Sequence, residues 1–318
     1  MKKTARAHTN IALIKYWGKK DPKLRLPLMS SLSMTLDKFY TDTSIEAAEE
    51  NSFYLNNEKQ TSNASKRVFS YLEMLKKKYD ITDNFTVSSI NHVPTAAGLA
   101  SSSSAFAALA SAFCAYYNIN VDKKELSRLA RMGSGSASRS IYGGFAIWQK
   151  GDDNSSFAYS LDEKPKMDLH LLAIELNKNQ KSISSTKGME LAQTSSFFET
   201  WIQKNDSELN EMIQAIKDED FTKLGSLAEL NASEMHAVNL SAQPPFTYFE
   251  PDTIKAIKLV ENMRTQGIEC YYTIDAGPNV KVLCQLRNVK DIKQRFESSF
   301  NNVTIIDASF GPGVSYLD

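Results

Sequence analysis

The sequence predicts an α+β protein built from two domains. The chain has 318 residues, about twice the ~150 residues of a common domain. Short strand-like runs alternate with helical stretches in the N-terminal half, whereas helices dominate from about residue 190 onward. Hydrophobic residues make up 42% of the chain and charged residues 23%. This globular composition allows each half to bury a core without disulfides or structural metals.

In the N-terminal half, apolar alternation predicts strands and spacing of three or four residues predicts helices. One such helix carries Val68, Leu72 and Leu75 on a single face. The strands are expected near residues 4–10, 31–36, 41–46, 52–56, 84–91, 142–149 and 169–176, and the helices near 61–79, 102–117 and 122–132. We place the domain boundary near residue 178, which gives domains 1–178 and 179–318.

In the C-terminal half the same criteria predict a helical block followed by a mixed segment. Pro244 and Pro245 interrupt the helical block. The helices are expected near 190–203, 207–217, 220–236, 251–266 and 289–299, and the strands near 269–275, 280–286 and 302–307.

The charge balance argues against a nonspecific nucleic-acid binder. Lys and Arg number 37, and so do Asp and Glu, whereas a nonspecific binder normally carries a basic surplus. No apolar run approaches the ~18 residues of a membrane span, and polar residues follow Met1-Lys2-Lys3 where a signal peptide needs an apolar region. We therefore expect a cytoplasmic protein. The three cysteines and four histidines are scattered, so we expect reduced core thiols and no transition-metal site.

Two segments rich in small residues suit the binding of anions. Pro94 to Ser104 follows a strand-like run and opens an alanine-rich helix, and the N-terminus of a helix favours phosphate. The segment lacks the Gly-Lys-Ser/Thr of a Walker A loop, and it also fits a tight turn with an N-cap. Gly133 to Ser140 contains Arg139, which could clamp a carboxylate or phosphate. A flexible loop with a surface arginine is the alternative.

Three further segments carry polar groups in unusual settings. Asn10, Lys15, Tyr16 and Lys19 lie among apolar residues, where snorkelling lysines on an apolar element are the simplest interpretation. Asp275 ends a β-type run before a Gly-Pro turn. It fits a ligand-facing acid, and it also fits an Asx turn. The polar segment from Lys181 to Gly188 fits a lid over phosphates, and it also fits a solvated linker.

Taken together, these segments resemble the mevalonate diphosphate decarboxylases of the GHMP kinase superfamily. The resemblance spans the chain and is carried, in the order and approximate spacing of that family, by Asn10 to Lys19, Pro94 to Ser104, Ser134 to Arg139 and Asp275 to Asn279. The Pro94 segment alone marks only the superfamily, whereas the segments at Tyr16 to Lys19 and Ser134 to Arg139 are more specific. The resemblance implies the GHMP kinase fold, with an N-terminal domain like ribosomal protein S5 domain 2 and a ferredoxin-like C-terminal domain.

The resemblance also implies roles for individual residues. Asp275, Arg139 and Asn10 are the expected catalytic residues. The expected substrate-binding residues are Tyr16, Trp17, Gly18, Lys19, Arg67, Ser134, Gly135, Ser136, Ala137, Ser138, Arg139, Ser185 and Thr186. The expected ATP-binding residues are Pro94, Ala97, Gly98, Leu99, Ala100, Ser101, Ser102, Ser103, Ser104, Lys181 and Lys187. Mg²⁺ is expected mainly on the ATP phosphates, with Ser104 as a candidate ligand.

The implied reaction is the ATP-dependent decarboxylation of mevalonate 5-diphosphate to isopentenyl diphosphate, in the mevalonate route of isoprenoid biosynthesis, by a homodimeric enzyme. Two related activities remain open: a GHMP small-molecule kinase that stops at the phosphoester, and a decarboxylase of mevalonate 5-monophosphate. A non-catalytic ligand-binding protein on the same scaffold is a third alternative.

Overall fold

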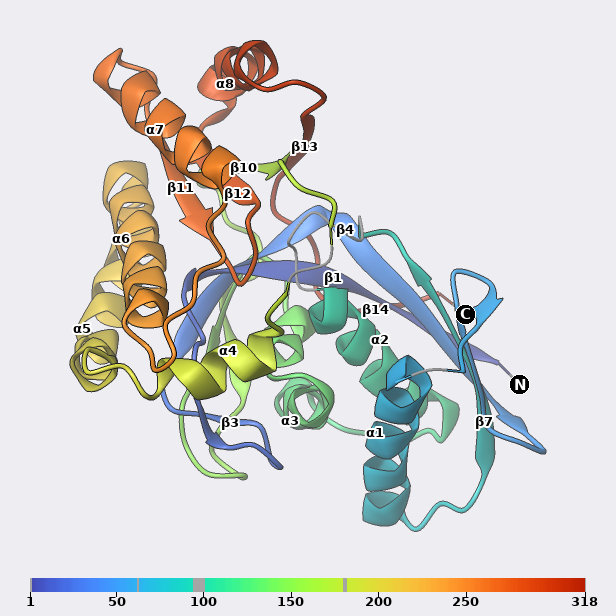
Figure 1. Ribbon diagram of the computed structural model, residues 1–318. Helices are drawn as coiled ribbons and strands as arrows, with labels where there is room; N and C mark the ends of the chain where they lie inside the picture. The colour runs from blue at the N-terminus through green and yellow to red at the C-terminus, as the bar shows by residue number, and fades with distance from the viewer. Residues whose placement is uncertain (1, 62, 94–100, 180–181, 318) are drawn as a thin grey trace.

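The computed structural model describes residues 2–61, 63–93, 101–179 and 182–317. Two β-sheets and their covering helices build the molecule, with the larger sheet below and the smaller one above in Figure 1. The mixed α+β class predicted from the sequence is confirmed.

The larger sheet has eight strands in the order β14-β1-β4-β7-β5-β6, with β8 paired to β4 and β9 paired to β8. These strands are β1 (Lys3–Ile14), β4 (Ser31–Ala48), β5 (Ser52–Leu55), β6 (Glu58–Lys59), β7 (Asn84–Asn91), β8 (Phe145–Trp148), β9 (Ala158–Asp162) and β14 (Ser315–Tyr316). A separate hairpin joins β2 (Lys19–Asp21) to β3 (Leu26–Pro27).

The long strand β4 corrects the prediction of two strands at 31–36 and 41–46. The polar pair Asp37-Lys38 interrupts the apolar pattern, but the backbone stays paired with β1 through a register shift between His8 and Asn10. β9 was not predicted.

Helices cover one face of the larger sheet (Figure 1). They are α1 (Asn63–Tyr79), α2 (Ser101–Tyr116), α3 (Lys123–Gly133) and the 3₁₀ helix η1 (Gly135–Ile141). Their apolar side chains form a core with β1, β7 and β8. The alanines of α2 permit close packing, and Ala107, Ala108 and Ala110 are fully buried. α2 therefore lies against the sheet with its first residues at the site described below.

The smaller sheet has the order β11-β12-β10-β13. Its strands are β10 (His170–Glu175), β11 (Cys270–Ile274), β12 (Val280–Cys284) and β13 (Thr304–Ala308), and α7 (Pro251–Thr265) and α8 (Leu286–Ser299) pack on it. The strand expected at 169–176 exists, but its assignment to the N-terminal half was wrong, because β10 pairs with β12 and β13. Local patterning identifies a strand without identifying its partner. The domain division at residue 178 stays a prediction.

The helices after residue 184 also differ from prediction. They are α4 (Ser185–Ala192), α5 (Phe198–Lys217) and α6 (Phe221–Leu240). We expected a break near residues 204–206, but α5 is continuous there. Asn205 does not end the helix; it is buried and donates to the Ser30 carbonyl at 3.0 Å. The polar segment at 184–188 forms the start of α4, capped where the Ser184 hydroxyl accepts from the Lys187 amide.

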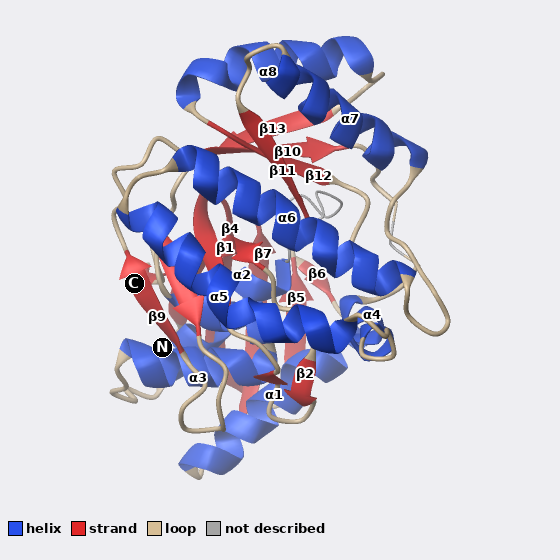
Figure 2. Cartoon of the chain, turned by 90° about the vertical axis from the view of Figure 1, so that its left-hand side faces the viewer, coloured by secondary structure: helices blue, strands red, loops and turns tan. Residues whose placement is uncertain are grey.

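One apolar core joins the two sheets. It combines residues of β1, β4 and β8 with residues of β10 and β12, and with α5 and α6. Figure 2 shows α5 and α6 lying side by side in front of the larger sheet, with the smaller sheet above α6, and α6 contacts both β1 and β11. The ends of β1 and β11 are therefore held in one packed unit.

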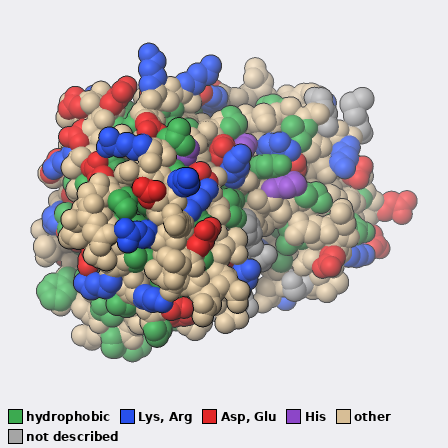
Figure 3. Space-filling view, turned by 90° about the horizontal axis from the view of Figure 1, so that it is seen from above, with side chains coloured by type: hydrophobic (Ala, Val, Ile, Leu, Met, Phe, Trp, Pro, Cys, Tyr) green, Lys and Arg blue, Asp and Glu red, His purple; other side chains and the backbone are tan. Residues whose placement is uncertain are grey.

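The outer surface carries charges of both signs. On the face seen in Figure 3, acidic and basic side chains are interspersed, as the equal numbers in the sequence predict. None of the helices in the described ranges is both long and apolar enough to cross a bilayer.

We expect the α6–β11 contact to make Gly225→Ala destabilising by about 1–3 kcal/mol. An exposed helical Gly→Ala change would instead gain up to ~1 kcal/mol. A Cβ at Gly225 would lie 2.0 Å from the Tyr271 ring, so the ring or the helix must move. Urea unfolding measures the free energy, with Ser207→Ala, an exposed position on α5, as control. A Gly225→Ala protein as stable as the wild type would contradict this packing.

Candidate active site

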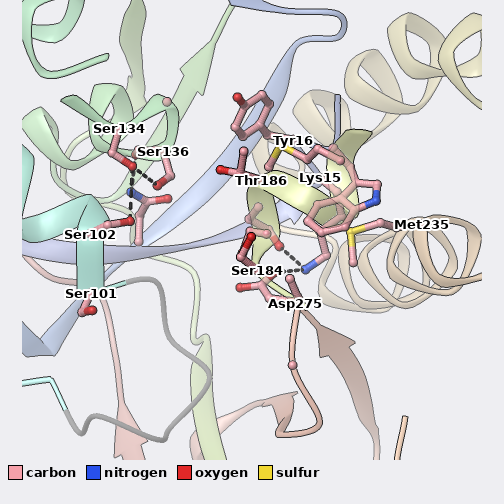
Figure 4. Close-up of a pocket in the computed structure, with 18 of the residues that line it drawn as sticks. Lys15, Tyr16, Ser101, Ser102, Ser134, Ser136, Ser184, Thr186, Met235 and Asp275 are labelled. Atoms are coloured by element: carbon pink, nitrogen blue, oxygen red, sulfur yellow. Dashed lines mark hydrogen bonds and ion pairs between the residues drawn. The ribbon is translucent and has the colours of Figure 1, made fainter. Parts of the chain in front are cut away.

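A cavity of about 470 Å³ lies where the two sheets meet. Its walls come from β1, the N-terminus of α2, the start of η1, the start of α4 and the turn after β11. In Figure 4 the serines of α2 and η1 lie on one side of the cavity, and Lys15 and Asp275 lie on the other. Segments more than a hundred residues apart in the sequence thus share one space.

A buried ion pair forms the floor on the second side. Lys15, immediately after β1, is 2% exposed, and its Nζ lies 2.8 Å from Oδ1 of Asp275, immediately after β11. The same nitrogen donates to the Ala12 carbonyl at 2.9 Å and to the Thr273 hydroxyl at 2.7 Å. Three acceptors use all three N–H bonds of an ammonium group. Lys15 is therefore a fixed cation in contact with the Asp275 carboxylate.

The neighbouring cations keep Asp275 ionised. Burial alone would raise the pKa of its carboxyl, but the positive charges of Lys15 and Lys281 outweigh burial and hold the pKa below its ordinary value. The hydrogen bond from Lys15 and the charge of Arg139 act in the same direction. Burial lowers the pKa of Lys15 in turn, against the attraction of Asp275.

Arg139 is a second buried cation, 2% exposed, and Asn10 holds its guanidinium. Nε and Nη2 donate to Asn10 Oδ1 at 3.3 and 3.2 Å, and Nη1 donates to the Ser31 hydroxyl. Asn10 Nδ2 donates to the Ser136 carbonyl at 3.0 Å and the Ser140 hydroxyl at 2.8 Å. Burial lowers the pKa of Arg139 to about 10, so it remains charged at neutral pH.

Small residues bring backbone and hydroxyl groups to the opposite wall. The Ser134 hydroxyl lies 3.2 Å from that of Ser102 and 3.4 Å from that of Ser136. Gly135 allows this approach, since a Cβ there would meet Trp148 at 2.8 Å and Tyr16 at 2.9 Å. The wall can therefore present several donors to an anion.

The third part of the site joins the N-terminal segment to α4. Lys19 Nζ donates to the Thr186 hydroxyl at 3.3 Å. Tyr16 lines the same side, and its buried hydroxyl has no hydrogen-bond partner among the described residues. An unpartnered buried hydroxyl is costly, and an anion in the cavity would relieve that cost.

Most of the sequence-predicted residues meet at this cavity. Those that line it are Asn10, Tyr16, Trp17, Lys19, Arg67, Ser101, Ser102, Ser134, Gly135, Ser136, Arg139, Ser185, Thr186 and Asp275. They come from six separate stretches of the chain, which the sequence-based prediction assigned to one site.

Other predicted residues do not line the cavity. Ser104 is fully buried, with its hydroxyl 2.8 Å from that of Thr41, so the structure places this Mg²⁺ candidate in the core. Lys187 points to Glu190 at 3.3 Å instead. Gly18, Ser103, Ala137 and Ser138 are also buried outside the lining. Pro94, Ala97, Gly98, Leu99, Ala100 and Lys181 lie outside the described residues.

Two cations of the cavity had no predicted role. Lys15 is fully enclosed and does not snorkel, so that interpretation was wrong for it. A lysine directly after the apolar run Ile11 to Ile14 was the available signal. Arg25, in the turn between β2 and β3, also lines the cavity. Nothing in its polar turn distinguishes it from a surface arginine.

The described residues fit a bound nucleotide and a hard cation. Ser101 and Ser102 begin α2 and line the cavity. The first N–H groups of a helix lack intrahelical partners and favour phosphate, and serine hydroxyls are oxygen ligands of the kind that Mg²⁺ accepts.

Comparisons with known proteins agree along nearly the whole chain. Residues 7–158 match the diphosphomevalonate decarboxylase-like N-terminal domain. Residues 171–313 match the mevalonate 5-diphosphate decarboxylase C-terminal domain. The diphosphomevalonate decarboxylase of Ganoderma lucidum is 34% identical, over 97% of this chain and 84% of its own.

Solved structures extend the agreement to three dimensions. Mevalonate diphosphate decarboxylase from Staphylococcus aureus superposes with a TM-score of 0.96 at 43% identity, covering 100% of this chain and 98% of its own. A structure described as MDDEF in complex with MVAPP, AMPPCP and magnesium superposes with a TM-score of 0.94 at 44% identity, covering 100% and 99% of the two chains. On its sequence, its fold and the arrangement of its cavity, the chain belongs to the mevalonate diphosphate decarboxylase family.

Proposed function

We propose that this protein catalyses the ATP-dependent decarboxylation of mevalonate 5-diphosphate, giving isopentenyl diphosphate, ADP, phosphate and carbon dioxide. The observation that carries the proposal is the ionised Asp275, paired with buried Lys15, in the same cavity as Arg139. Family membership and the relative described with MVAPP, AMPPCP and magnesium support it. The reaction is a step of the mevalonate route of isoprenoid biosynthesis.

The reaction requires the protein to position its two substrates, and it involves no covalent bond to the protein. The tertiary hydroxyl of the substrate leaves poorly as hydroxide, so its oxygen first takes the γ-phosphoryl group of ATP. Phosphate then departs with the C–O bond pair, and positive charge grows at the tertiary carbon. The carboxylate releases carbon dioxide, and its C–C bond pair forms the alkene. Charges that the protein holds in fixed positions can lower the barrier to phosphoryl transfer and the barrier to the loss of phosphate and carbon dioxide.

In this mechanism Asp275 accepts a hydrogen bond from the tertiary hydroxyl and orients its oxygen toward ATP. A carboxylate with a lowered pKa is a weak base, but a loose phosphoryl-transfer transition state needs little proton removal before the new bond forms. The proton can therefore move to Asp275 late. The carboxylate also lies near the carbon where positive charge later develops.

Arg139 binds the carboxylate of the substrate, and Asn10 keeps the guanidinium of Arg139 in place. Its hydrogen bonds to Asn10 and Ser31 fix the guanidinium plane before the substrate arrives, so binding costs little side-chain entropy. We assign Asn10 a positioning role, because both of its amide atoms are already engaged by the protein.

The remaining polar and basic groups of the cavity bind the phosphates of the substrate and of ATP. Tyr16, Lys19, the Ser134 to Ser136 segment and Thr186 face the diphosphate tail of the substrate, and Arg67 extends this side at the mouth of the cavity. The start of α2 faces ATP, where Ser101 and Ser102, rather than Ser104, would hold Mg²⁺. Mg²⁺ neutralises phosphate charge when bound. The ATP-binding roles of Pro94 to Ala100, Lys181 and Lys187 remain predictions.

We further propose a cytoplasmic homodimer, as the family resemblance implies. Sedimentation velocity measures the oligomeric state of the purified chain. A monomer at micromolar concentration would contradict the proposed dimer without affecting the proposed reaction.

The direct test of the function is a product count. The purified protein is incubated with ATP, Mg²⁺ and mevalonate 5-diphosphate, and ADP, phosphate, carbon dioxide and isopentenyl diphosphate are measured together. Equal amounts of all four are expected. ADP without carbon dioxide would indicate a kinase, and ATP binding without turnover would indicate a binding protein. In a parallel reaction with mevalonate 5-monophosphate, turnover of that compound alone would indicate the shorter substrate.

Asp275→Asn tests the orienting carboxylate. We expect kcat to fall about 10³-fold, within the range for loss of a positioned acid–base group, while the Kd for ATP stays unchanged. Single-turnover kinetics and nucleotide titration measure the two quantities. The control is Asp206→Asn, an exposed acid on α5 that pairs with Lys150. Near-normal turnover of Asp275→Asn would remove this residue from the chemistry.

Arg139→Lys tests the guanidinium. Lysine keeps the charge but loses the planar fork that Asn10 and Ser31 hold. Loss of one charge-assisted hydrogen bond predicts a decrease of about 10- to 100-fold in kcat/KM. Arg287→Lys, which changes a 70%-exposed side chain, is the control. Wild-type kcat/KM in Arg139→Lys would contradict the assigned clamp.

Lys15→Met tests how the buried cation acts on Asp275. Without Lys15 the ionised form of Asp275 is less favoured and its pKa rises, so the acid limb of the kcat/KM profile moves to higher pH. The melting temperature shows whether the variant folds, and Lys15→Arg, which keeps a cation, should keep the wild-type acid limb. If Lys15→Met folds and its acid limb is unchanged, Lys15 does not set the ionisation of Asp275.

A further inference from the structure

Arg25 is a cation of the cavity, and its backbone adopts an unfavourable conformation. It lies in the turn between β2 and β3 and lines the cavity. Its backbone φ is 53°, in the left-handed region that residues other than glycine rarely adopt. Nε donates to the Met132 carbonyl at 2.8 Å. The half-buried side chain is thus held against the end of α3.

Arg25 belongs to a cationic cluster with Lys19 and Arg67. Burial lowers the pKa of Lys19, and the charge of Arg25 lowers it further. Burial and the charge of Arg25 also lower the pKa of Arg67, to about 10. In the described ranges none of the three forms an ion pair with a carboxylate, although Glu190 acts on Lys19 from a distance. The cluster therefore holds positive charge that no carboxylate of the described residues contacts directly.

The end of α3 anchors two of these cations beside the serine wall. Arg25 donates to the carbonyl of Met132, and Arg67 Nη2 donates to that of Gly133 at 3.3 Å. These are the last two residues of α3, and the chain continues directly into Ser134 to Ser136. Among the described contacts, Nη1 and Nη2 of Arg25 make no hydrogen bond within the protein. Two parallel donors remain for a ligand.

The cluster lies beyond Tyr16 from the reacting centre. Tyr16 directly follows Lys15, whose Nζ contacts Asp275, and the Tyr16 ring lies beside Gly135. Arg25 and Arg67 are held at the carbonyls of Met132 and Gly133, just before that glycine. A substrate with its carboxylate at Arg139 and its hydroxyl at Asp275 would extend its phosphate tail past Tyr16 toward the cluster.

From this placement we propose that Arg25 is a specificity-determining residue that binds the terminal phosphate of the substrate and sets the preference for a diphosphate over a monophosphate. The inference rests on the proposed function. A terminal phosphate adds negative charge and acceptor oxygens that match two parallel guanidinium donors. A monophosphate ends short of Arg25, so only the longer tail gains from it.

The test compares wild type with Arg25→Asn, since asparagine tolerates the left-handed backbone. Calorimetry gives the Kd of mevalonate 5-diphosphate and of mevalonate 5-monophosphate. We expect affinity for the diphosphate to fall about 10- to 100-fold, the worth of one charge-assisted hydrogen bond, with affinity for the monophosphate and KM for ATP nearly unchanged. Arg25→Lys should lose only part of the preference, and Lys23→Ala, an exposed cation of the same turn, should lose none.

An equal loss for both substrates, no loss for either, or a loss confined to ATP would overturn the role of Arg25. If Arg25→Asn does not fold, as its melting curve would show, Arg25→Lys decides: a preference identical to wild type contradicts the proposal. The proposed function has its own readout. Absence of carbon dioxide release by the wild type rejects the function, whereas normal release with an unchanged preference in the variants rejects only the inference about Arg25.

Discussion

The ion pair between Lys15 and Asp275 is the constraint on which the rest of the site depends. It joins the end of β1 to the end of β11, and these strands belong to different sheets. An enclosed ammonium is costly to desolvate and is tolerated only when its acceptors are in place. The three acceptors of Lys15 come from both sheets. The pair therefore ties the charge state of the site to the correct packing of the two halves.

The cavity is electrostatically unlike the outer surface of the protein. Its described lining contains five cations, Lys15, Lys19, Arg25, Arg67 and Arg139, and one carboxylate, Asp275. The chain as a whole has no net charge. A positive, partly enclosed space concentrates anions and strengthens their interactions with fixed charges. Such a space suits two substrates that together carry a carboxylate, a diphosphate and a triphosphate.

Much of the fold and the site followed from short-range patterns. Small residues before α2 and η1 fitted anion-facing turns, and Asp275 at a strand end fitted a ligand-facing acid. Each pattern also fitted a purely structural interpretation, and the resemblance to a known family favoured the functional one. Properties that depend on distant partners did not follow. The sequence could not show that β10 pairs with β12 rather than in the larger sheet, that Ser104 faces Thr41 in the core, or that Arg25 reaches the cavity. In each case the deciding neighbour lies far along the chain.

The pKa of the Asp275 carboxyl is the quantity that tests the role of the buried ion pair most directly. Carbon-13 NMR of protein labelled at aspartate side chains follows the titration, and the Asp275→Asn spectrum assigns the signal. We expect the Asp275 carboxyl to titrate below the ordinary aspartate pKa in the wild-type protein, and at a higher pKa in Lys15→Met than in the wild type. An Asp275 carboxyl that titrates at or above the ordinary value in the wild-type protein would contradict the central role given to the buried ion pair.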